Sequence, residues 1–140
     1  MNSIEKIEEF AKENYVPIAR KETLEYIKKI FKENNYKSFL EIGTAIGYTC
    51  INVALIDPSI RILTLEYEEK RFNLAKENIK DFKVEKQIQQ VYGDARFFYP
   101  DLYCDVIFID AAKKRNKYFL DKFSKRLNSK GTIIIDNMNL

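Results

Sequence analysis

The chain is 140 residues long, with 46% apolar residues, 32% charged residues and a net charge of +3. These values are typical of one globular domain and exclude a disordered or membrane-spanning chain. Histidine is absent, which excludes Ser-His-Asp catalysis, Cys-His catalysis and histidine-ligated zinc.

Two amphipathic helices are predicted first. Apolar residues follow helical spacing over residues 2–11, and Pro17 ends that element. A second helix is predicted over 24–31, where the same spacing continues until the asparagine pair 34–35. We interpret residues 1–36 as N-terminal helices that pack on the rest of the domain.

Strands alternate with helices over residues 37–140, which we interpret as the core of the domain. The expected strands are 38–42, 60–65, 88–92, 105–109 and 132–135, and the expected helices are 48–56, 69–79, 95–99 and 118–127. This alternation predicts right-handed crossovers and a parallel sheet. The last two strands are apolar without alternation, which favours helices on both faces of the sheet. The fold class is therefore α/β, a Rossmann-like three-layer αβα domain with a mainly parallel sheet.

Candidate binding residues follow the first three strands, because ligands of open parallel sheets lie outside the carboxyl ends. After the first strand, Gly43 permits a tight turn and Gly47 permits close approach of a helix or ligand. Glu66 stands 23 residues after Gly43, at a spacing suited to ribose hydroxyls. Asp94 follows the third strand and could accept a hydrogen bond from adenine. Singly, each also fits a turn glycine, a surface acid or a helix cap, but three at consecutive strand ends are more specific.

The turn after the first strand favours a cationic ligand over a pyrophosphate. Ala45 occupies the second glycine position of the dinucleotide-binding pattern, and no basic residue lies between Glu41 and Ile60. The carboxylate of Glu41 disfavours a pyrophosphate and suits a ligand with a cationic amine. The sequence therefore favours S-adenosylmethionine over NAD.

The segment Leu40–Thr49 resembles the first motif of class I S-adenosylmethionine-dependent methyltransferases. Together with Val16–Ile18, Gly93–Ala95, Phe108–Lys113 and Ile135–Asn137, it resembles the cation-dependent O-methyltransferases, which include the catechol and caffeoyl-CoA enzymes. The bacterial branch, with its tRNA 5-hydroxyuridine methyltransferase, is the most similar. The resemblance runs over nearly the whole chain.

The resemblance implies a cofactor-binding set spread over the strand ends. This set is Ala19, Glu41, Gly43, Thr44, Ala45, Gly47, Tyr48, Thr49, Glu66, Asp94, Ala95 and Asp110. Within it, Glu41, Gly43, Gly47 and Tyr48 would shape the methionine pocket and Thr49 would help hold the carboxylate. Glu66 would bind the ribose, while Asp94 and Ala95 would line the adenine.

The resemblance also implies that Asp110, Asp136 and Asn137 bind a divalent cation, and that Lys113 assists deprotonation of the acceptor hydroxyl. A physical reason supports the cation site, because Asp110 and Asp136 end two strands expected to be neighbours. Hard oxygen ligands suit Mg²⁺. The alternative role of Asp110 is a helix or turn cap, and that of Asp136 and Asn137 is a turn after an edge strand. Lys114, Arg115 and Lys117 are alternatives to Lys113, in a run that also fits a solvated surface.

The sheet order implied by the family is 3-2-1-4-5, followed in relatives by two more strands that this chain lacks. We therefore expect a recognisable cofactor pocket, an incomplete acceptor wall and weak or absent methyl transfer. A homodimer is a further expectation from the family.

The acceptor is expected to be tRNA or a small hydroxylated molecule. Residues 111–130 carry eight basic residues and one acid, which modestly favours RNA over the reading of a solvated helix face. The expected function is Mg²⁺-dependent O-methylation of 5-hydroxyuridine in tRNA. The alternatives are a catechol-like acceptor, a non-catalytic cofactor-binding module, and a nucleotide-dependent dehydrogenase that Ala45 disfavours.

The compartment is expected to be the cytoplasm, without membrane attachment. Cys50 and Cys104 lie far apart in the sequence and suggest reduced thiols. The first residues lack the basic start and apolar stretch of a signal peptide.

Overall fold

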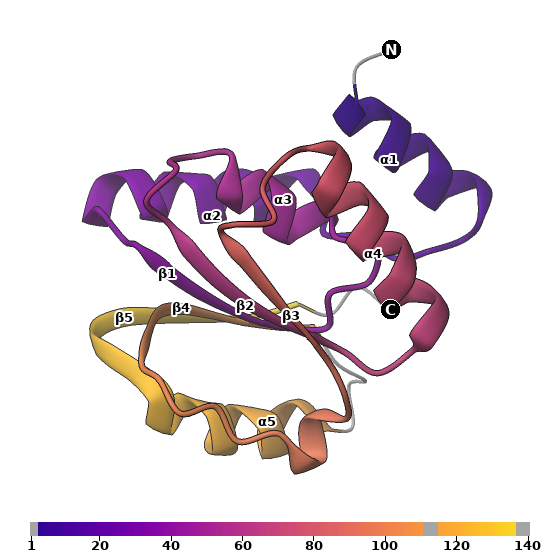
Figure 1. Ribbon diagram of the computed structural model, residues 1–140. Helices are drawn as coiled ribbons and strands as arrows, with labels where there is room; N and C mark the ends of the chain where they lie inside the picture. The colour runs from indigo at the N-terminus through magenta and orange to yellow at the C-terminus, as the bar shows by residue number, and fades with distance from the viewer. Residues whose placement is uncertain (1–2, 111–114, 137–140) are drawn as a thin grey trace.

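The structure is a computed structural model that describes residues 3–110 and 115–136. Its elements are α1 (Ser3–Glu13), α2 (Lys21–Asn34), β1 (Ser38–Ile42), α3 (Tyr48–Ala54), β2 (Arg61–Glu66), α4 (Glu69–Asp81), β3 (Ile88–Tyr92), η1 (Ala95–Phe97), β4 (Cys104–Ile109), α5 (Asn116–Phe123), η3 (Ser124–Arg126) and β5 (Leu127–Ile135). Figure 1 shows them in place.

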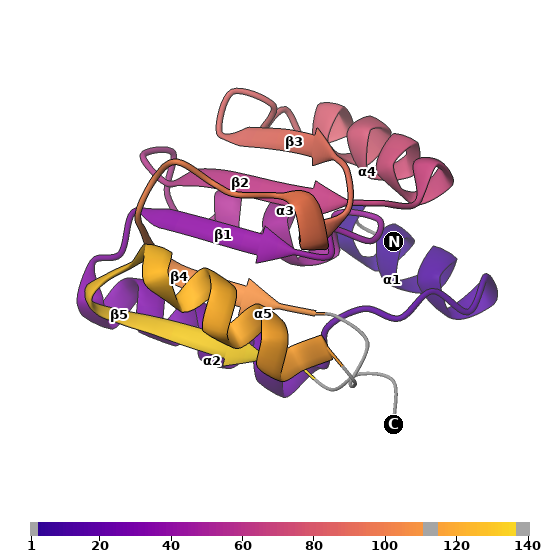
Figure 2. The same cartoon turned by 90° about the horizontal axis from the view of Figure 1, so that it is seen from below.

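The described strands form one parallel sheet in the order β3-β2-β1-β4-β5. The central strand β1 pairs with β2 on one side and β4 on the other, so Ile42 lies between Leu65 and Ile109. Figure 2 shows the strand arrows pointing to the same side of the molecule. The predicted α/β class and strand order are confirmed.

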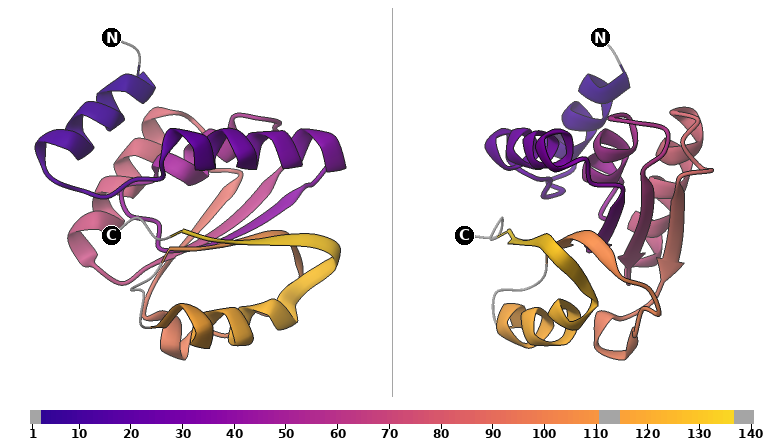
Figure 3. Two further views of the ribbon diagram at one scale, coloured as in Figure 1. Left: turned by 180° about the vertical axis from the view of Figure 1, so that it is seen from behind. Right: turned by 90° about the vertical axis from the view of Figure 1, so that its left-hand side faces the viewer.

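Helices cover both faces of the sheet, as the apolar strands predict. The helices α2, α3 and α4 lie on one face and α5 lies on the other (Figures 1 and 3). Successive residues of a strand point to opposite faces, and β1 illustrates this, because Phe39 and Leu40 are both buried but belong to different core clusters.

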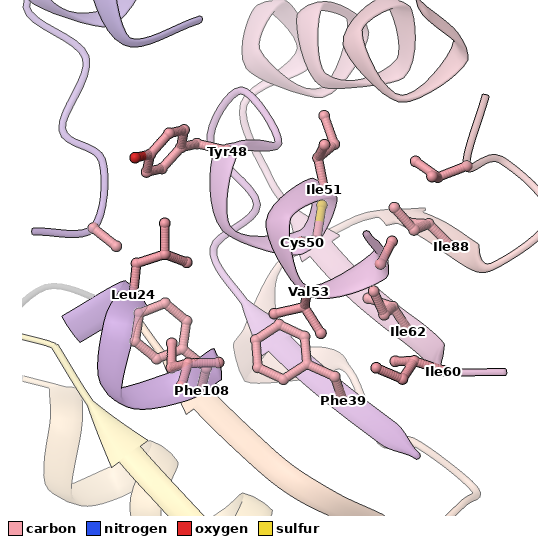
Figure 4. Packing of buried hydrophobic residues seen from close by; sticks show 14 of the residues in the cluster. Leu24, Phe39, Tyr48, Cys50, Ile51, Val53, Ile60, Ile62, Ile88 and Phe108 are labelled. Carbon is pink, nitrogen blue, oxygen red and sulfur yellow. The ribbon is translucent and has the colours of Figure 1, made fainter. Parts of the chain in front are cut away.

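The larger cluster fills the space between the sheet and α2, α3 and α4. Phe39 and Phe108 stack there with ring centroids 6.3 Å apart, beside Val53 of α3 and Ile62 of β2 (Figure 4). Cys50 is buried in the same cluster, and both cysteines are free and buried. The smaller cluster packs Phe119 and Phe123 of α5 against the other face.

The C-terminal part differs from the prediction. The helix expected over 118–127 begins at Asn116, changes to a 3-10 turn at Ser124 and ends before Leu127, where β5 already begins. Leu127 pairs with Cys104, whereas Thr132 pairs with Val106. The polar stretch between those two pairs contains Lys130 in a left-handed conformation, and this irregular, polar segment has none of the apolar pattern by which a strand is predicted.

Among residues 3–110 and 115–136, no helix has the length and apolar character needed to cross a membrane. The N-terminal helix α1 buries Ile7 and Ala11 and packs against α3. The division into 1–36 and 37–140 stays a prediction.

Candidate functional site

Backbone hydrogen bonds extend past the ends of the strands and align the residues that follow them. The N–H of Gly43 donates to Leu65 at 2.9 Å, and the N–H of Asp110 donates to Ile42 at 2.9 Å. The N–H of Asp136 likewise donates to Ile109 at 3.0 Å. Gly43, Asp110 and Asp136 are therefore held at one edge of the sheet.

The turn after β1 depends on Gly43. Its φ is +105°, and a Cβ at this position would overlap the backbone oxygen of Asp110. No side chain fits between these two strand ends, so glycine is required for both conformation and space. Gly47 has a φ of +92° and begins α3, where its α-carbon faces Ala75 of α4. A Cβ here would meet Ile51 and Ala75 only at ordinary contact distances of 3.4 and 3.5 Å, so the left-handed conformation is what favours glycine.

Glu66 is fixed by two backbone donors. Its Oε1 accepts from the N–H of Ala45 at 2.8 Å and its Oε2 accepts from the N–H of Glu68 at 3.1 Å. Burial raises the pKa of this carboxyl, and the two N–H donors oppose that effect. The side chain is therefore oriented before any ligand binds, with lone pairs left on both oxygens.

A small cavity brings together eight of the predicted cofactor residues. These are Ala19, Glu41, Gly43, Thr44, Ala45, Tyr48, Thr49 and Asp110, joined by Pro17, Ile18 and Phe108. Its volume is about 10 Å³, room for one water. Gly47, Glu66, Asp94 and Ala95 do not line it. A ligand group larger than one water could enter this cavity only if part of its lining, which includes Pro17–Ala19, moved outward.

Glu41 is a buried acid held by a chain of hydroxyl groups. Its exposed fraction is 1%, and its Oε1 accepts from Thr64 Oγ1 at 2.7 Å. The Thr64 hydroxyl lies 2.5 Å from that of Thr44, so Thr44 donates to Thr64 in this arrangement. Burial, with a smaller contribution from the charge of Asp110, raises the pKa of Glu41 to about 8. A cationic ligand group nearby would favour its ionised form.

Tyr48 joins the cavity to the N-terminal helix. Its hydroxyl donates to Glu8 Oε2 of α1 at 2.6 Å, and burial raises the pKa of the phenol above its usual range. Thr49 follows in α3, lines the cavity and is buried.

Asp94 and Ala95 already have partners outside the cavity. The Asp94 carboxylate caps η1 by accepting from the N–H of Arg96 at 2.8 Å, and it pairs with the Arg96 guanidinium at 2.6 Å. The guanidinium lowers the pKa of Asp94 to about 2. The Ala95 carbonyl accepts from Lys122 Nζ at 2.6 Å. The alternative role of a helix cap is thus observed for Asp94, while a role toward adenine stays a prediction.

Asp110 and Asp136 follow the neighbouring strands β4 and β5, whose last paired residues are Ile109 and Ile135. Asp136 has an exposed fraction of 3%. Burial, followed by the negative charge of Asp136, raises the pKa of Asp110 to about 7. Asp110 is partly buried and Asp136 is buried, and their negative charges repel each other. Carboxylate oxygens are ligands of the kind that Mg²⁺ takes, and a divalent cation between the two would offset the repulsion. Within residues 3–110 and 115–136 no group of three or more acidic or cysteine side chains is placed to hold a metal ion, so these two carboxylates supply only part of such a site.

Two predicted residues, Lys113 and Asn137, lie outside the described residues. Their roles as base and third cation ligand stay predictions.

Sequence comparison assigns the family. A family model described as "O-methyltransferase" matches residues 2–139. The chain belongs to this O-methyltransferase family.

Relatives within and around the family share about a third of the aligned residues. The chain is 34% identical over 112 residues to the O-methyltransferase imqG of Aspergillus flavus, covering 73% of this chain and 45% of that protein. It is 37% identical over 111 residues to a catechol O-methyltransferase of Niastella koreensis, covering 73% and 49% respectively. The chain thus spans about half the length of these curated relatives.

The fold matches solved structures over nearly the whole chain. A candidate caffeoyl-CoA O-methyltransferase from Staphylococcus aureus superposes with a TM-score of 0.91 at 39% identity, covering 98% of this chain and 67% of that one. The parallel sheet with order 3-2-1-4-5 and its flanking helices are therefore the methyltransferase arrangement of the Rossmann-like fold.

Sequence reasoning missed three residues of the candidate site. Thr64 is a polar residue between the apolar residues Leu63 and Leu65 of a strand, a signal that could have identified it. Phe108 lines the cavity but looks like any buried strand residue. Glu8 reaches Tyr48 from 40 residues away, and no local pattern indicates such a contact.

Proposed function

We propose that this chain binds S-adenosylmethionine and transfers its methyl group to a hydroxyl, most favourably that of 5-hydroxyuridine in tRNA. The observation that carries the proposal is the cavity after β1, where Glu41 lies beside a glycine turn that no basic residue follows before Ile60. This environment suits the ammonium and sulfonium of the cofactor and disfavours a pyrophosphate.

The chain's own residues would bind and orient the cofactor. Glu41 would face the cationic methionine end, with Thr64 fixing its carboxylate, while Glu66 would accept hydrogen bonds from the ribose hydroxyls. Glu66 is held by two backbone donors, so little side-chain freedom would be lost on binding. Methyl transfer from a sulfonium depends mainly on positioning.

Asp110 and Asp136 would hold a divalent cation, together with Asn137. Such an ion lowers the pKa of a hydroxyl that it contacts and orients the oxygen. Lys113 is proposed as the base that takes the hydroxyl proton, a role that requires its pKa to be depressed.

Two acceptor classes differ in their support. The eight basic residues within 111–130 favour an RNA acceptor, because phosphate contacts come largely from lysine and arginine. The name of the Niastella koreensis relative, a catechol O-methyltransferase, favours a small aromatic diol as the second candidate.

A methyl-transfer assay separates these candidates. The chain is incubated with radiolabelled S-adenosylmethionine and either undermodified tRNA or a catechol, with Mg²⁺ or with a chelator. We expect slow, Mg²⁺-dependent labelling of tRNA. Labelling of the catechol alone would favour the second candidate. Binding of cofactor without transfer to either acceptor would contradict methylation and indicate a non-catalytic binding module.

A matched pair of variants tests the cation site. Asp136→Asn should lower Mg²⁺-dependent transfer by at least a hundredfold and leave the affinity for S-adenosylhomocysteine within threefold. The control is Asp81→Asn, which alters an exposed carboxylate at the end of α4 and should change neither. Equal transfer by Asp136→Asn and the unaltered chain would rule out the proposed cation site.

A further inference from the structure

A groove runs along α5, separate from the cavity after β1. It has a volume of about 580 Å³ and lies between the connection from η1 to β4 and the helix α5 with its following turn η3. Figure 1 shows this connection passing alongside α5. Its lining includes Tyr99, Tyr103, Tyr118, Lys122, Lys125 and Arg126. None of these six residues belongs to the predicted cofactor or metal set.

Three tyrosine rings of the groove are open to solvent. The exposed fractions are 72% for Tyr99, 58% for Tyr103 and 50% for Tyr118. Exposed aromatic rings gathered in one concave surface are unusual for a monomeric protein and mark interaction sites. Aromatic rings that are open to solvent can stack with the planar rings of a ligand.

The groove also carries fixed positive charge beside these rings. Lys122 Nζ donates to the Ala95 and Arg96 carbonyls at 2.6 and 2.9 Å and lies 3.9 Å from the centre of the Tyr99 ring. The Arg126 guanidinium lies 5.4 Å from the centre of the Tyr103 ring. The rings of Tyr99 and Tyr103 therefore each contact a cation, while more than half of each tyrosine remains exposed to solvent.

The acid in the groove lining is compensated. Asp121 pairs with Lys117 at 3.3 Å, one turn earlier on α5, so Lys122, Lys125 and Arg126 give the groove a net positive charge. Asp121 therefore does little to repel an anionic ligand.

We propose that this groove binds single-stranded RNA, with bases stacked on the tyrosines and phosphates held by Lys125 and Arg126. Aromatic platforms within a basic groove are the means by which proteins hold unpaired strands, whereas a duplex keeps its bases out of reach. The inference extends the proposed function, because a tRNA acceptor would need a surface of this kind, but its test involves no methyl transfer.

Fluorescence anisotropy with a labelled, unstructured 12-nucleotide RNA tests the groove directly. We expect the unaltered chain to bind this RNA, and Tyr99→Ala with Tyr103→Ala to weaken binding at least tenfold through lost stacking. Phenylalanine at the same two positions should restore most of the affinity, since the rings remain. The double variant Lys125→Glu with Arg126→Glu should weaken binding. It should also reduce the slope of the logarithm of the binding constant against the logarithm of salt concentration by about 0.7 per lost phosphate contact.

The matched control lies on the opposite layer of the molecule. Tyr26→Ala with Lys32→Glu removes an exposed ring and a lysine from α2 and should change the affinity for RNA by less than twofold. Calorimetry with S-adenosylhomocysteine checks that every variant keeps the other site. The proposal is wrong if the unaltered chain does not bind the single-stranded RNA, or if it binds a 12-base-pair duplex as tightly. It is also wrong if the tyrosine variants bind the RNA as tightly as the control variant does. Loss of methylation with intact RNA binding would count against the proposed function alone.

Discussion

The buried side chain of Glu41 couples the binding of a cationic ligand in the candidate site to a change of protonation. It is enclosed by the strands β1, β2 and β4, with Thr64 as its hydrogen-bond donor and the acids Asp110 and Glu66 adding negative charge nearby. Water is excluded, so the charged form is disfavoured and the pKa rises to about 8. A cationic ligand would reverse that balance, which couples ligand binding to the loss of a proton.

The buried acid predicts that the stability of the ligand-free protein falls as pH rises. Between the unfolded pKa of 4.5 and the folded pKa of about 8, the folded state keeps a proton that the unfolded chain releases. Stability from this group is therefore full below pH 4.5 and is lost progressively up to about pH 8, at roughly 1.4 kcal/mol per pH unit. Urea unfolding at pH 5, 6, 7 and 8 measures the slope.

The variant Glu41→Gln should reduce the slope of the free energy of unfolding against pH by the contribution of about one proton, because an amide does not titrate. The exposed residue Glu85 supplies the control, since Glu85→Gln should keep the slope of the unaltered chain. Should Glu41→Gln retain the full slope, the buried proton would have to be assigned to another group.

At the level of elements, the turn between β1 and α3 contacts the carboxyl ends of two other strands, β2 and β4. Gly43 bonds to the end of β2 through its N–H, and its α-carbon lies against the backbone of Asp110 after β4. The glycine is thus required because the backbones of two neighbouring strand ends meet there. A side chain would push the candidate metal ligand away from its position.

Gly43→Ala should destabilise the fold by about 2 kcal/mol or more, because alanine disfavours the left-handed region and its Cβ overlaps a backbone oxygen. Gly93→Ala is the matched control, since its Cβ would meet only a Leu65 methyl at 3.7 Å and should cost less than 1 kcal/mol. Urea unfolding of both variants measures the difference. Equal stabilities would show that the turn relaxes without strain.

The regular elements could be predicted because each has a local signal. Uninterrupted apolar runs mark β4 and the end of β5, and helical spacing marks α2, whose end at the left-handed Asn35 was expected from the asparagine pair. The start of β5 could not be predicted, because residues 128–131 are polar and lie at a register shift between the pairs Leu127–Cys104 and Thr132–Val106.

The candidate site was predictable to the extent that it follows strand ends. Glu41, Gly43 and Asp110 come together in one cavity because parallel strands end at the same edge. Its small volume and the ion pair of Asp94 with Arg96 could not be predicted, since both depend on side-chain packing that leaves no periodic pattern in the sequence.

At the scale of the whole molecule, α1 and the segment that follows it close the site. The Tyr48 hydroxyl binds Glu8 of α1, and Pro17–Ala19 form a wall of the cavity. The cavity has a volume of about 10 Å³, so we expect the ligand group that contacts Glu41 to displace this wall. The helix α1 buries only Ile7 and Ala11, which makes it one of the less firmly held elements.

Glu8→Ala should release α1 and speed ligand entry. The lost hydrogen bond joins the buried Tyr48 phenol to a carboxylate and is worth about 1–3 kcal/mol, so the free energy of unfolding should fall by about that amount. We expect faster hydrogen exchange in α1 and several-fold faster association of S-adenosylhomocysteine in stopped-flow fluorescence. The neighbouring variant Glu9→Ala, also on an exposed face of α1, should leave both rates unchanged. Unaltered rates in Glu8→Ala would mean that α1 does not limit entry.

We propose that the edge formed by β1, β2 and β3 binds an adenosine cofactor with a methionine end and not a dinucleotide. Isothermal titration calorimetry of the chain with S-adenosylhomocysteine and with NAD distinguishes the two ligands. We expect one S-adenosylhomocysteine per chain, at least tenfold weaker binding to Glu66→Gln, and no heat with NAD. Binding of NAD without S-adenosylhomocysteine, or affinity for the latter that Glu66→Gln leaves untouched, would contradict it.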